Sequence, residues 1–180
     1  MRMAGPDDVD AVLEVHRRAF GRDEGDVVAR LVAALLRDDP AALSLVADDD
    51  GVVVGHVLLS RSLLDTPGQL VEVAVLSPLG VLPERQGQGI GAALVRRSLA
   101  LADERRVPVV FLEGSPRYYP RLGFTPGGEL GFRKPSLRIP DEAFQAIRLS
   151  AYEPWMTGTL VYSSTFWDHD CVGLRESPAR

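Results

Sequence analysis

Hydrophobic residues recur at helical spacing in two stretches near the start of the chain. The first stretch follows Gly5-Pro6, and the second runs from Asp26 to Arg37, where Asp38-Asp39-Pro40 ends it. The apolar face of the first stretch carries Val9, Leu13, His16 and Phe20. We therefore predict two amphipathic helices, and we expect the histidine to be half-buried with its hydrogen bonds satisfied rather than catalytic.

The spacing then changes to that of strands. Residues 43–47 and 52–59 flank the polar turn 48–51, a pattern that predicts two antiparallel strands. Residues 70–76 predict a third strand, which continues past Pro78 to Leu82. Because proline lacks a backbone donor, its place in this strand indicates an edge, a bulge or a splayed end.

Helical spacing returns from Gly87 to about Arg105, and a short, wholly apolar run at 108–112 is typical of a buried parallel strand. Strand character appears again at 144–149 and 157–162. No repeat, linker or break in composition interrupts the chain. We predict one α/β domain over residues 1–180 with a mixed central sheet.

Composition and charge exclude several classes of protein. Of the 180 residues, 46% are hydrophobic and 25% are charged, as in an ordinary folded domain, and a net charge of −5 without a basic run argues against nucleic-acid binding. No apolar stretch is long enough to span a membrane, and the first residues do not resemble a signal peptide, so we expect a cytoplasmic protein. Cys171 is the single cysteine, and the run Asp168-His169-Asp170 cannot converge on one ion, so we expect no metal site.

The most informative segment is the glycine-rich loop that opens the helix after residue 82. Gly87, Gly89 and Gly91 allow a ligand to approach the backbone, and the first turn of a helix presents unpaired N–H groups and a positive dipole end. Alternating glycines weaken a helix start by roughly 1 kcal/mol each relative to alanine. This cost favours an anion site, with a phosphate or pyrophosphate as the ligand, over a plain turn.

The loop also fits a dinucleotide-binding pattern. Gly87, Gly89 and Ala92 match G-x-G-x-x-A, and Glu113 ends the next strand, where an acid that binds ribose would lie. Two observations argue against this interpretation. Residues 83–86 separate the strand from the glycines, and the residues after Glu113 do not continue as strand–helix–strand units.

A second family covers far more of the chain. Residues 86–91 fit Q/R-x-x-G-x-G/A, the acetyl-CoA loop of the GNAT acetyltransferases, and residues 79–84 resemble the L-A-V-x-P-E segment that precedes it. Residues 119–124 resemble the Y-x-x-x-G-F segment of the same family. The resemblance extends over residues 6–167. Within the family, the chain most resembles an uncharacterised bacterial branch of predicted N-acetyltransferases.

The resemblance implies a GNAT fold, in which the mixed sheet is splayed between two parallel strands and carries flanking helices. It also implies that residues 125–180 are the variable C-terminal part of the domain and that acetyl-CoA is the cosubstrate. The backbone of Leu79, Gly80 and Val81 would pair with the pantetheine arm. The pyrophosphate would be held by the backbone amides of Gln86, Gly87, Gln88, Gly89, Ile90, Gly91 and Ala92.

For catalysis, the resemblance places Tyr119 where the family has the tyrosine that protonates the departing thiolate. Tyr118 is the second candidate, and at least one of the two tyrosines is expected to pack between helix and sheet. Glu113 is the candidate general base, acting through a water molecule, and the other interpretation of Glu113 is a partly solvated strand end.

The predicted activity is direct transfer of an acetyl group from the thioester to a primary amine. The first alternative function is that of a binding module that holds CoA without turnover. The second alternative is that of a dinucleotide-dependent oxidoreductase. The sequence does not distinguish between a small-molecule amine and a peptide amine as the acceptor. It is also compatible with a homodimer.

Overall fold

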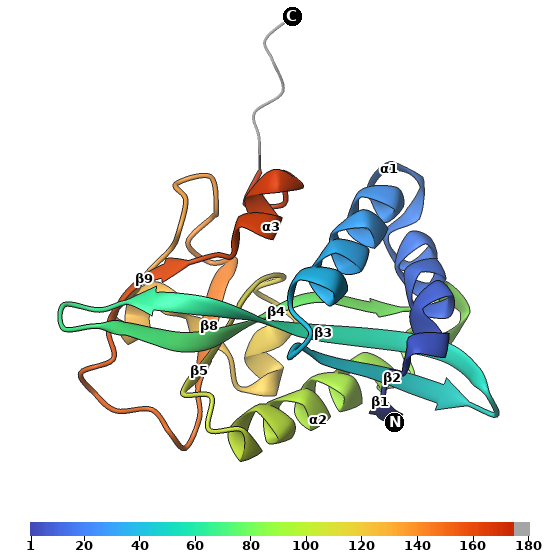
Figure 1. Cartoon of the computed structure of the whole chain (residues 1–180), viewed down its shortest axis with the longest axis horizontal. Helices are drawn as coiled ribbons and strands as arrows, with labels where there is room; N and C mark the ends of the chain where they lie inside the picture. Colours follow the sequence, from blue (N-terminus) through green and yellow to red (C-terminus); the bar gives the residue numbers. More distant parts are fainter. Residues whose placement is uncertain (175–180) are drawn as a thin grey trace, which may run out of the picture.

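The computed structural model describes residues 1–174. The chain begins with β1 (Arg2–Met3) and the 3-10 helix η1 (Pro6–Asp8), and α1 (Val9–Asp38) follows. The two predicted helices are the two halves of α1, which is broken at Gly21, where the backbone adopts φ +75°. The halves lie side by side (Figure 1), and a Cβ at Gly25 would lie 2.3 Å from the backbone oxygen of Arg17.

Three long strands form the middle of the sheet. β2 (Leu43–Asp49), β3 (Val52–Asp65) and β4 (Leu70–Val81) pair antiparallel in chain order, and β1 adds to β2 at the edge. β3 is six residues longer than the sequence predicts. Its last residues pair with β4 on one side and with β9 (Gly158–Val161) on the other, which buries Ser60 and Ser62 within the sheet. The sequence analysis missed this part of the strand because the segment contains polar residues, which interrupt the hydrophobic pattern.

Pro78 lies at a bulge in β4, one of the outcomes that the sequence predicts. β3 residues Val57 and Leu59 face Leu79 and Leu76, so β4 has one more residue than β3 at this point. The extra residue shifts the alternation of side chains. Val73 and Val75 therefore belong to the core beneath α1, whereas Leu79, beyond the bulge, faces the helix on the opposite side of the sheet.

β4 leads through the 3-10 helix η2 (Pro83–Arg85) to α2 (Ile90–Glu104) and then to β5 (Val109–Glu113). β5 pairs parallel to β4, as predicted, but the register covers only Ala74 with Val110 and Val75 with Phe111. On its other side, β5 pairs antiparallel with β8 (Phe144–Arg148) along its whole length. β4 and β5 thus separate just before Ser77 and Glu113, which confirms the splayed sheet.

Short elements complete the fold. The 3-10 helices η3 (Tyr119–Leu122) and η4 (Gly127–Leu130) flank β6 (Thr125–Pro126), which pairs with β8. β7 (Phe132–Arg133) pairs parallel to β9, and α3 (Ser164–Asp168) follows β9. The sequence did not predict β1, β6, β7 or α3, because elements of two to five residues are too short to show a period.

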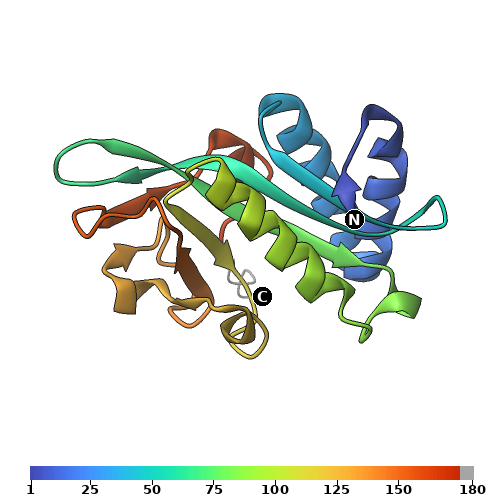
Figure 2. The same cartoon turned by 90° about the horizontal axis from the view of Figure 1, so that it is seen from below.

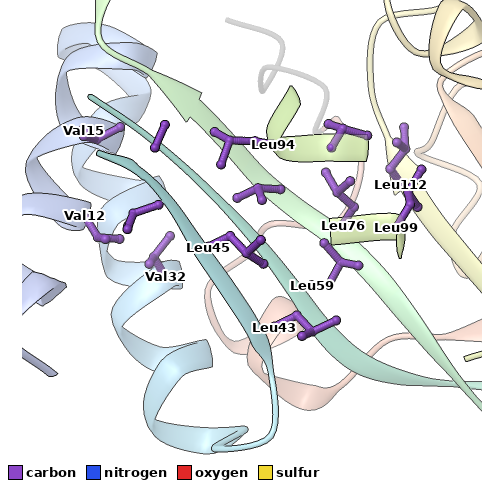
Figure 3. Packing of buried hydrophobic residues seen from close by; sticks show 14 of the residues in the cluster. Val12, Val15, Val32, Leu43, Leu45, Leu59, Leu76, Leu94, Leu99 and Leu112 are labelled. Atoms are coloured by element: carbon purple, nitrogen blue, oxygen red, sulfur yellow. The ribbon is translucent and has the colours of Figure 1, made fainter. Parts of the chain in front are cut away.

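The sheet lies between two layers of helix. Figure 1 shows α1 and α3 on one face and α2 on the other, and in Figure 2 α2 crosses in front of the strands. One core cluster joins α1, the sheet and α2 through residues such as Val15, Leu59 and Leu94 (Figure 3). A second cluster, around Phe111 and Phe166, fills the space between the sheet, the second half of α1 and α3.

A pair of histidines is buried between α1 and the sheet. His16 Nε2 lies 2.7 Å from His56 Nδ1, and His56 Nε2 lies 2.9 Å from Ser44 Oγ. Both rings are fully buried, and His16 Nδ1, which faces Gly80, has no hydrogen-bond partner among the described residues. His16 is therefore more buried, and less well satisfied, than the sequence predicts. Burial lowers the pKa of His16 to about 4 and holds the pKa of His56 well below its usual value.

These histidines should make the fold sensitive to mild acid. The unfolded histidines bind protons near pH 6.5 and the folded pair does not, so the free energy of unfolding is highest above pH 6.5 and falls as the pH drops toward 4. One pKa unit is worth about 1.4 kcal/mol, so His16 alone should lower the free energy of unfolding by about 1 kcal/mol between pH 7.5 and 5.5. Urea unfolding at the two pH values measures the loss.

The double variant His16→Gln/His56→Gln is the control. It should show a much smaller change between the same two pH values, because its buried amides do not titrate. An equal loss in the wild-type protein and the double variant would show that other groups cause the acid sensitivity.

Candidate functional site

Two cavities lie on opposite sides of the opening between β4 and β5. The cavity at the start of α2, called here the α2 cavity, has a volume of about 400 Å³. It is lined by Leu79, Val81, Arg85, Gln86, Gly87, Gly89, Ile90, Gly91, Ala92 and Tyr118. The cavity beneath the break in α1, called here the α1 cavity, has a volume of about 370 Å³. It is lined by Phe20, Glu24, Val27, Val28, Ser77, Glu113, Tyr162, Phe166, Asp170, Cys171 and Gly173.

The glycine loop gives the α2 cavity its polar end. Gly87 (φ +73°) and Gly89 (φ +81°) adopt the left-handed conformation, and Gly89 is the residue that caps α2. Within α2 the first backbone bond runs from Ala93 N–H to the carbonyl of Gly89, so the preceding N–H groups of the first turn have no partner in the helix. This end of a 15-residue helix combines free donors with the positive end of the helix dipole.

Gly91 keeps the α2 cavity open. Its backbone is helical, but a Cβ at this position would lie 2.9 Å from the Tyr118 hydroxyl and 3.7 Å from methyl groups of Leu79 and Val81. Any larger residue at position 91 would therefore fill the space between α2 and the end of β4. The glycine is required for the volume of the cavity rather than for the turn.

The structure brings together eight of the ten residues that the resemblance assigns to the cosubstrate. The two others do not line the cavity. Gly80 lies in β4 between Leu79 and Val81 and faces His16, and the Gln88 side chain contacts Arg85 and the backbone of Glu84. The resemblance assigns a role only to the backbone groups of these two residues, so their place in the site stays a prediction. The sequence analysis did not assign Arg85, which lines the cavity and forms an ion pair with Asp49. Its position directly before the loop was the only signal in the sequence.

The two tyrosines differ in their surroundings. Tyr118 is half exposed and lines the α2 cavity, whereas Tyr119 is largely buried against Gly114, whose Cβ would lie 2.3 Å from the Tyr119 ring. The two rings meet edge to face at 5.0 Å, and Tyr119 also contacts Phe124 at 5.7 Å. Burial raises the pKa of the Tyr119 phenol, so this hydroxyl carries its proton across the physiological range.

Glu113 lies on the other side of the opening, in the α1 cavity. Its carboxylate accepts hydrogen bonds from the Tyr162 hydroxyl at 2.8 Å and from the Gly173 N–H at 3.1 Å. Burial raises the pKa of Glu113, and these two donors, together with the charge of Arg138, oppose that shift. Glu113 is thus a half-buried, hydrogen-bonded acid at the end of β5, and its role as a base stays a prediction.

Of the other residues that the sequence analysis singles out, Asp170 and Cys171 line the α1 cavity, whereas Asp168 and His169 line neither cavity. Trp155 and Trp167 are exposed and line neither one. Within residues 1–174, no three His, Cys, Asp or Glu side chains are arranged to hold a metal ion. In the same part of the chain, no helix has the length and apolar character that a membrane span needs.

Residues 1–127 match the family model of the acetyltransferase (GNAT) domain. The chain belongs to the GNAT acetyltransferases. The loop that could also be interpreted as a dinucleotide site is therefore part of a GNAT domain, and the mixed sheet after β5 agrees with this assignment.

Similar proteins support the assignment. The uncharacterized N-acetyltransferase YjhQ of Escherichia coli K12 is 39% identical over 138 residues, which cover 75% of this chain and 74% of YjhQ. The uncharacterized N-acetyltransferase YhbS of the same strain is 33% identical over 83% of this chain and 87% of its own length.

Two solved structures are also similar. The crystal structure of E. coli YhbS in complex with CoA matches 92% of this chain and 89% of that one, with a TM-score of 0.81 and 31% identity. A GNAT acetyltransferase from Brucella melitensis in complex with acetyl-CoA matches 92% of this chain and 96% of that one, with a TM-score of 0.72 and 30% identity. Neighbouring members of the GNAT family thus bind CoA and acetyl-CoA.

The hydrogen bonds and burial of Glu113 predict how its carboxyl group titrates. Its carboxyl group should titrate above its ordinary pKa of 4.5, and Tyr162→Phe should raise the pKa further, because the phenol stabilises the ionised form. Carbon-13 NMR of the glutamate carboxyl groups follows both proteins.

Tyr152→Phe serves as the matched control for this titration. Tyr152 packs on Arg148 and Phe132, away from Glu113, and its loss should leave the Glu113 titration unchanged. A wild-type pKa at or below 4.5, or a lower value in Tyr162→Phe, would contradict this account of the site.

Proposed function

We propose that this GNAT protein transfers an acetyl group directly from acetyl-CoA to a primary amine. The observation that carries the proposal is the placement of the two cavities on either side of the opening between β4 and β5. One cavity offers helix N–H groups for an anion, and the other offers carboxylates for an amine. A thioester held from the first side would meet an amine that enters from the second.

The residues of the α2 cavity fit acetyl-CoA. The free N–H groups at the start of α2 suit a pyrophosphate, and Arg85 adds a positive charge beside them. Gly91 leaves the space that an arm running along Leu79 and Val81 would need. Acetyl-CoA, when bound, supplies the activated acetyl group and a thiol leaving group.

Direct transfer needs a group that accepts a proton and a group that donates one. As the amine nitrogen bonds to the thioester carbon and the carbon–sulfur bond breaks, Tyr119 donates its proton to the departing sulfur. Glu113, through a water molecule, accepts the proton that the amine loses. The raised pKa of Glu113 makes it a stronger base than an exposed carboxylate. Tyr119 is protonated at neutral pH, and its raised pKa makes the transfer to the thiolate more uphill than it would be from an exposed phenol.

A CoA-binding module without turnover is the second candidate, since the identity of the general base rests on Glu113 alone. Release of free thiol from acetyl-CoA in the presence of amines separates the two functions. An enzyme releases thiol in proportion to amine, whereas a binding module shows affinity for acetyl-CoA with no release above the hydrolytic background.

The cosubstrate site can be tested at Gly91. In Gly91→Val the new methyl groups should enter the α2 cavity and weaken acetyl-CoA binding at least tenfold by calorimetry, while the helical backbone at this position accepts the residue. Ala100→Val is the matched control, because Ala100 is exposed on the same helix. Equal acetyl-CoA affinity in the folded Gly91→Val protein and the control would overturn the assignment of this cavity.

The general acid can be tested at Tyr119. Tyr119→Phe keeps the ring against Gly114 but removes the proton donor, so kcat should fall by roughly 10²–10⁴-fold with little change in acetyl-CoA affinity. Steady-state kinetics with a saturating amine measures the effect.

Tyr118→Phe is the parallel variant for this test, and its kcat should stay close to the wild-type value. The reverse result would make Tyr118, which lines the α2 cavity, the acid. If neither variant is slower, both tyrosines serve only in packing.

A further inference from the structure

The α1 cavity has walls of a particular chemistry. Its aromatic side is formed by Phe20, Tyr162 and Phe166, of which Tyr162 and Phe166 stack at 4.8 Å between ring centroids. Val27 and Val28 extend this apolar surface from the second half of α1. A volume of about 370 Å³ is at the lower end of the roughly 300–1,000 Å³ of small-molecule sites.

Its charges have one sign. Glu24, Glu113 and Asp170 line the cavity, and no lysine or arginine among the described residues does. Arg138 lies beside Asp170, with 4.0 Å between guanidinium nitrogen and carboxylate oxygen, but it is not among the lining residues. Because this arginine is outside the lining, it lowers the negative potential without offering a partner to a ligand in the cavity.

The residues that line the α1 cavity indicate which class of amine would be the acceptor, and this inference rests on the proposed acetyl transfer. We propose that the α1 cavity binds a small primary amine with a compact apolar or aromatic body and no carboxylate or phosphate. Its ammonium group would lie near Glu113, at the opening toward the α2 cavity, and its body would contact the aromatic and valine side chains. An ammonium group close to aromatic faces also gains cation–π attraction.

The same walls exclude other amines. A carboxylate in the cavity would lie among three acids, and no basic side chain in the described part of the lining could pair with it. A sugar-based antibiotic with many hydroxyl groups would lose its hydrogen bonds to water against an apolar wall. If the amine of a lysine side chain lay near Glu113, the polar peptide backbone of that lysine would lie against the apolar side chains of Val27 and Val28.

The experiment compares 2-phenylethylamine, phenylalanine amide and phenylalanine, which share one ring and one primary amine. Binding is measured by calorimetry in the presence of saturating CoA, and turnover is measured by thiol release from acetyl-CoA. Phenylethylamine and the amide should bind, and phenylalanine should bind at least tenfold more weakly than its amide. Kanamycin A and Nα-acetyl-lysine methylamide should be poorer acceptors than phenylethylamine.

Two variants place the amine in this cavity. Val27→Trp should fill the cavity and weaken phenylethylamine binding at least tenfold, with acetyl-CoA affinity unchanged because the α2 cavity is on the other side of the opening. Glu24→Gln should weaken phenylethylamine binding about two- to fivefold, the usual size for an exposed charge. Glu14→Gln, on the first half of α1 and outside the cavity, should have no effect.

The outcomes separate this proposal from the proposed function. Phenylethylamine binding that Val27→Trp abolishes, without thiol release, would support the cavity assignment and overturn acetyl transfer. Turnover of kanamycin, of the lysine derivative or of phenylalanine at least as fast as that of phenylethylamine would overturn the acceptor class and leave acetyl transfer intact. Phenylethylamine binding that is equal in the wild-type protein and Val27→Trp would also overturn the cavity assignment.

Discussion

β4 pairs with β3 along almost its whole length but with β5 over only two residue pairs, and the candidate site depends on this difference. A bulge at Ser77–Pro78 adds a residue to β4, and proline has no N–H to donate to a neighbouring strand. Beyond the bulge, Leu79 and Val81 face α2 instead of α1. The strands separate at the same level, so a gap opens in the sheet where both helical layers can contribute side chains.

The two helical layers supply opposite chemistry to this gap. α2 begins at a glycine loop whose N–H groups and dipole favour an anion, and Gly91 keeps the space beside it free. On the other side, the break in α1 brings Phe20 and Glu24 over Ser77, while β5 ends at Glu113. A cosubstrate that carries a pyrophosphate and an acceptor that carries an ammonium would therefore approach one another from opposite faces of a single sheet.

The buried histidine pair lies between α1 and the sheet, next to the candidate site. His16 lies directly behind Gly80, where a side chain on β4 would collide with the imidazole. The pair therefore packs against the part of β4 that borders the α2 cavity, and it remains neutral because burial disfavours the charged ring. This polar contact is costly in a core, and it joins α1 to His56 on β3, beside the strand at which the sheet opens.

The sequence by itself determined the order of the longer helices and strands, the family and the glycine loop, because these depend on local spacing and on residues close together in the chain. Residues 79–92 are such a segment, and eight of its ten predicted contacts line one cavity. Only the tertiary structure decided what lies across the gap. Glu113 is bonded to Tyr162 and Gly173, which are 49 and 60 residues away in the chain, and Gly80 faces a histidine on the opposite side from the loop. Phe20, Glu113 and Asp170 line the α1 cavity although they are far apart in the chain. The hydrophobic pattern of the sequence does not predict that they lie close together. Packing between distant segments determines how deeply each side chain is buried, and this burial sets the direction of its pKa shift.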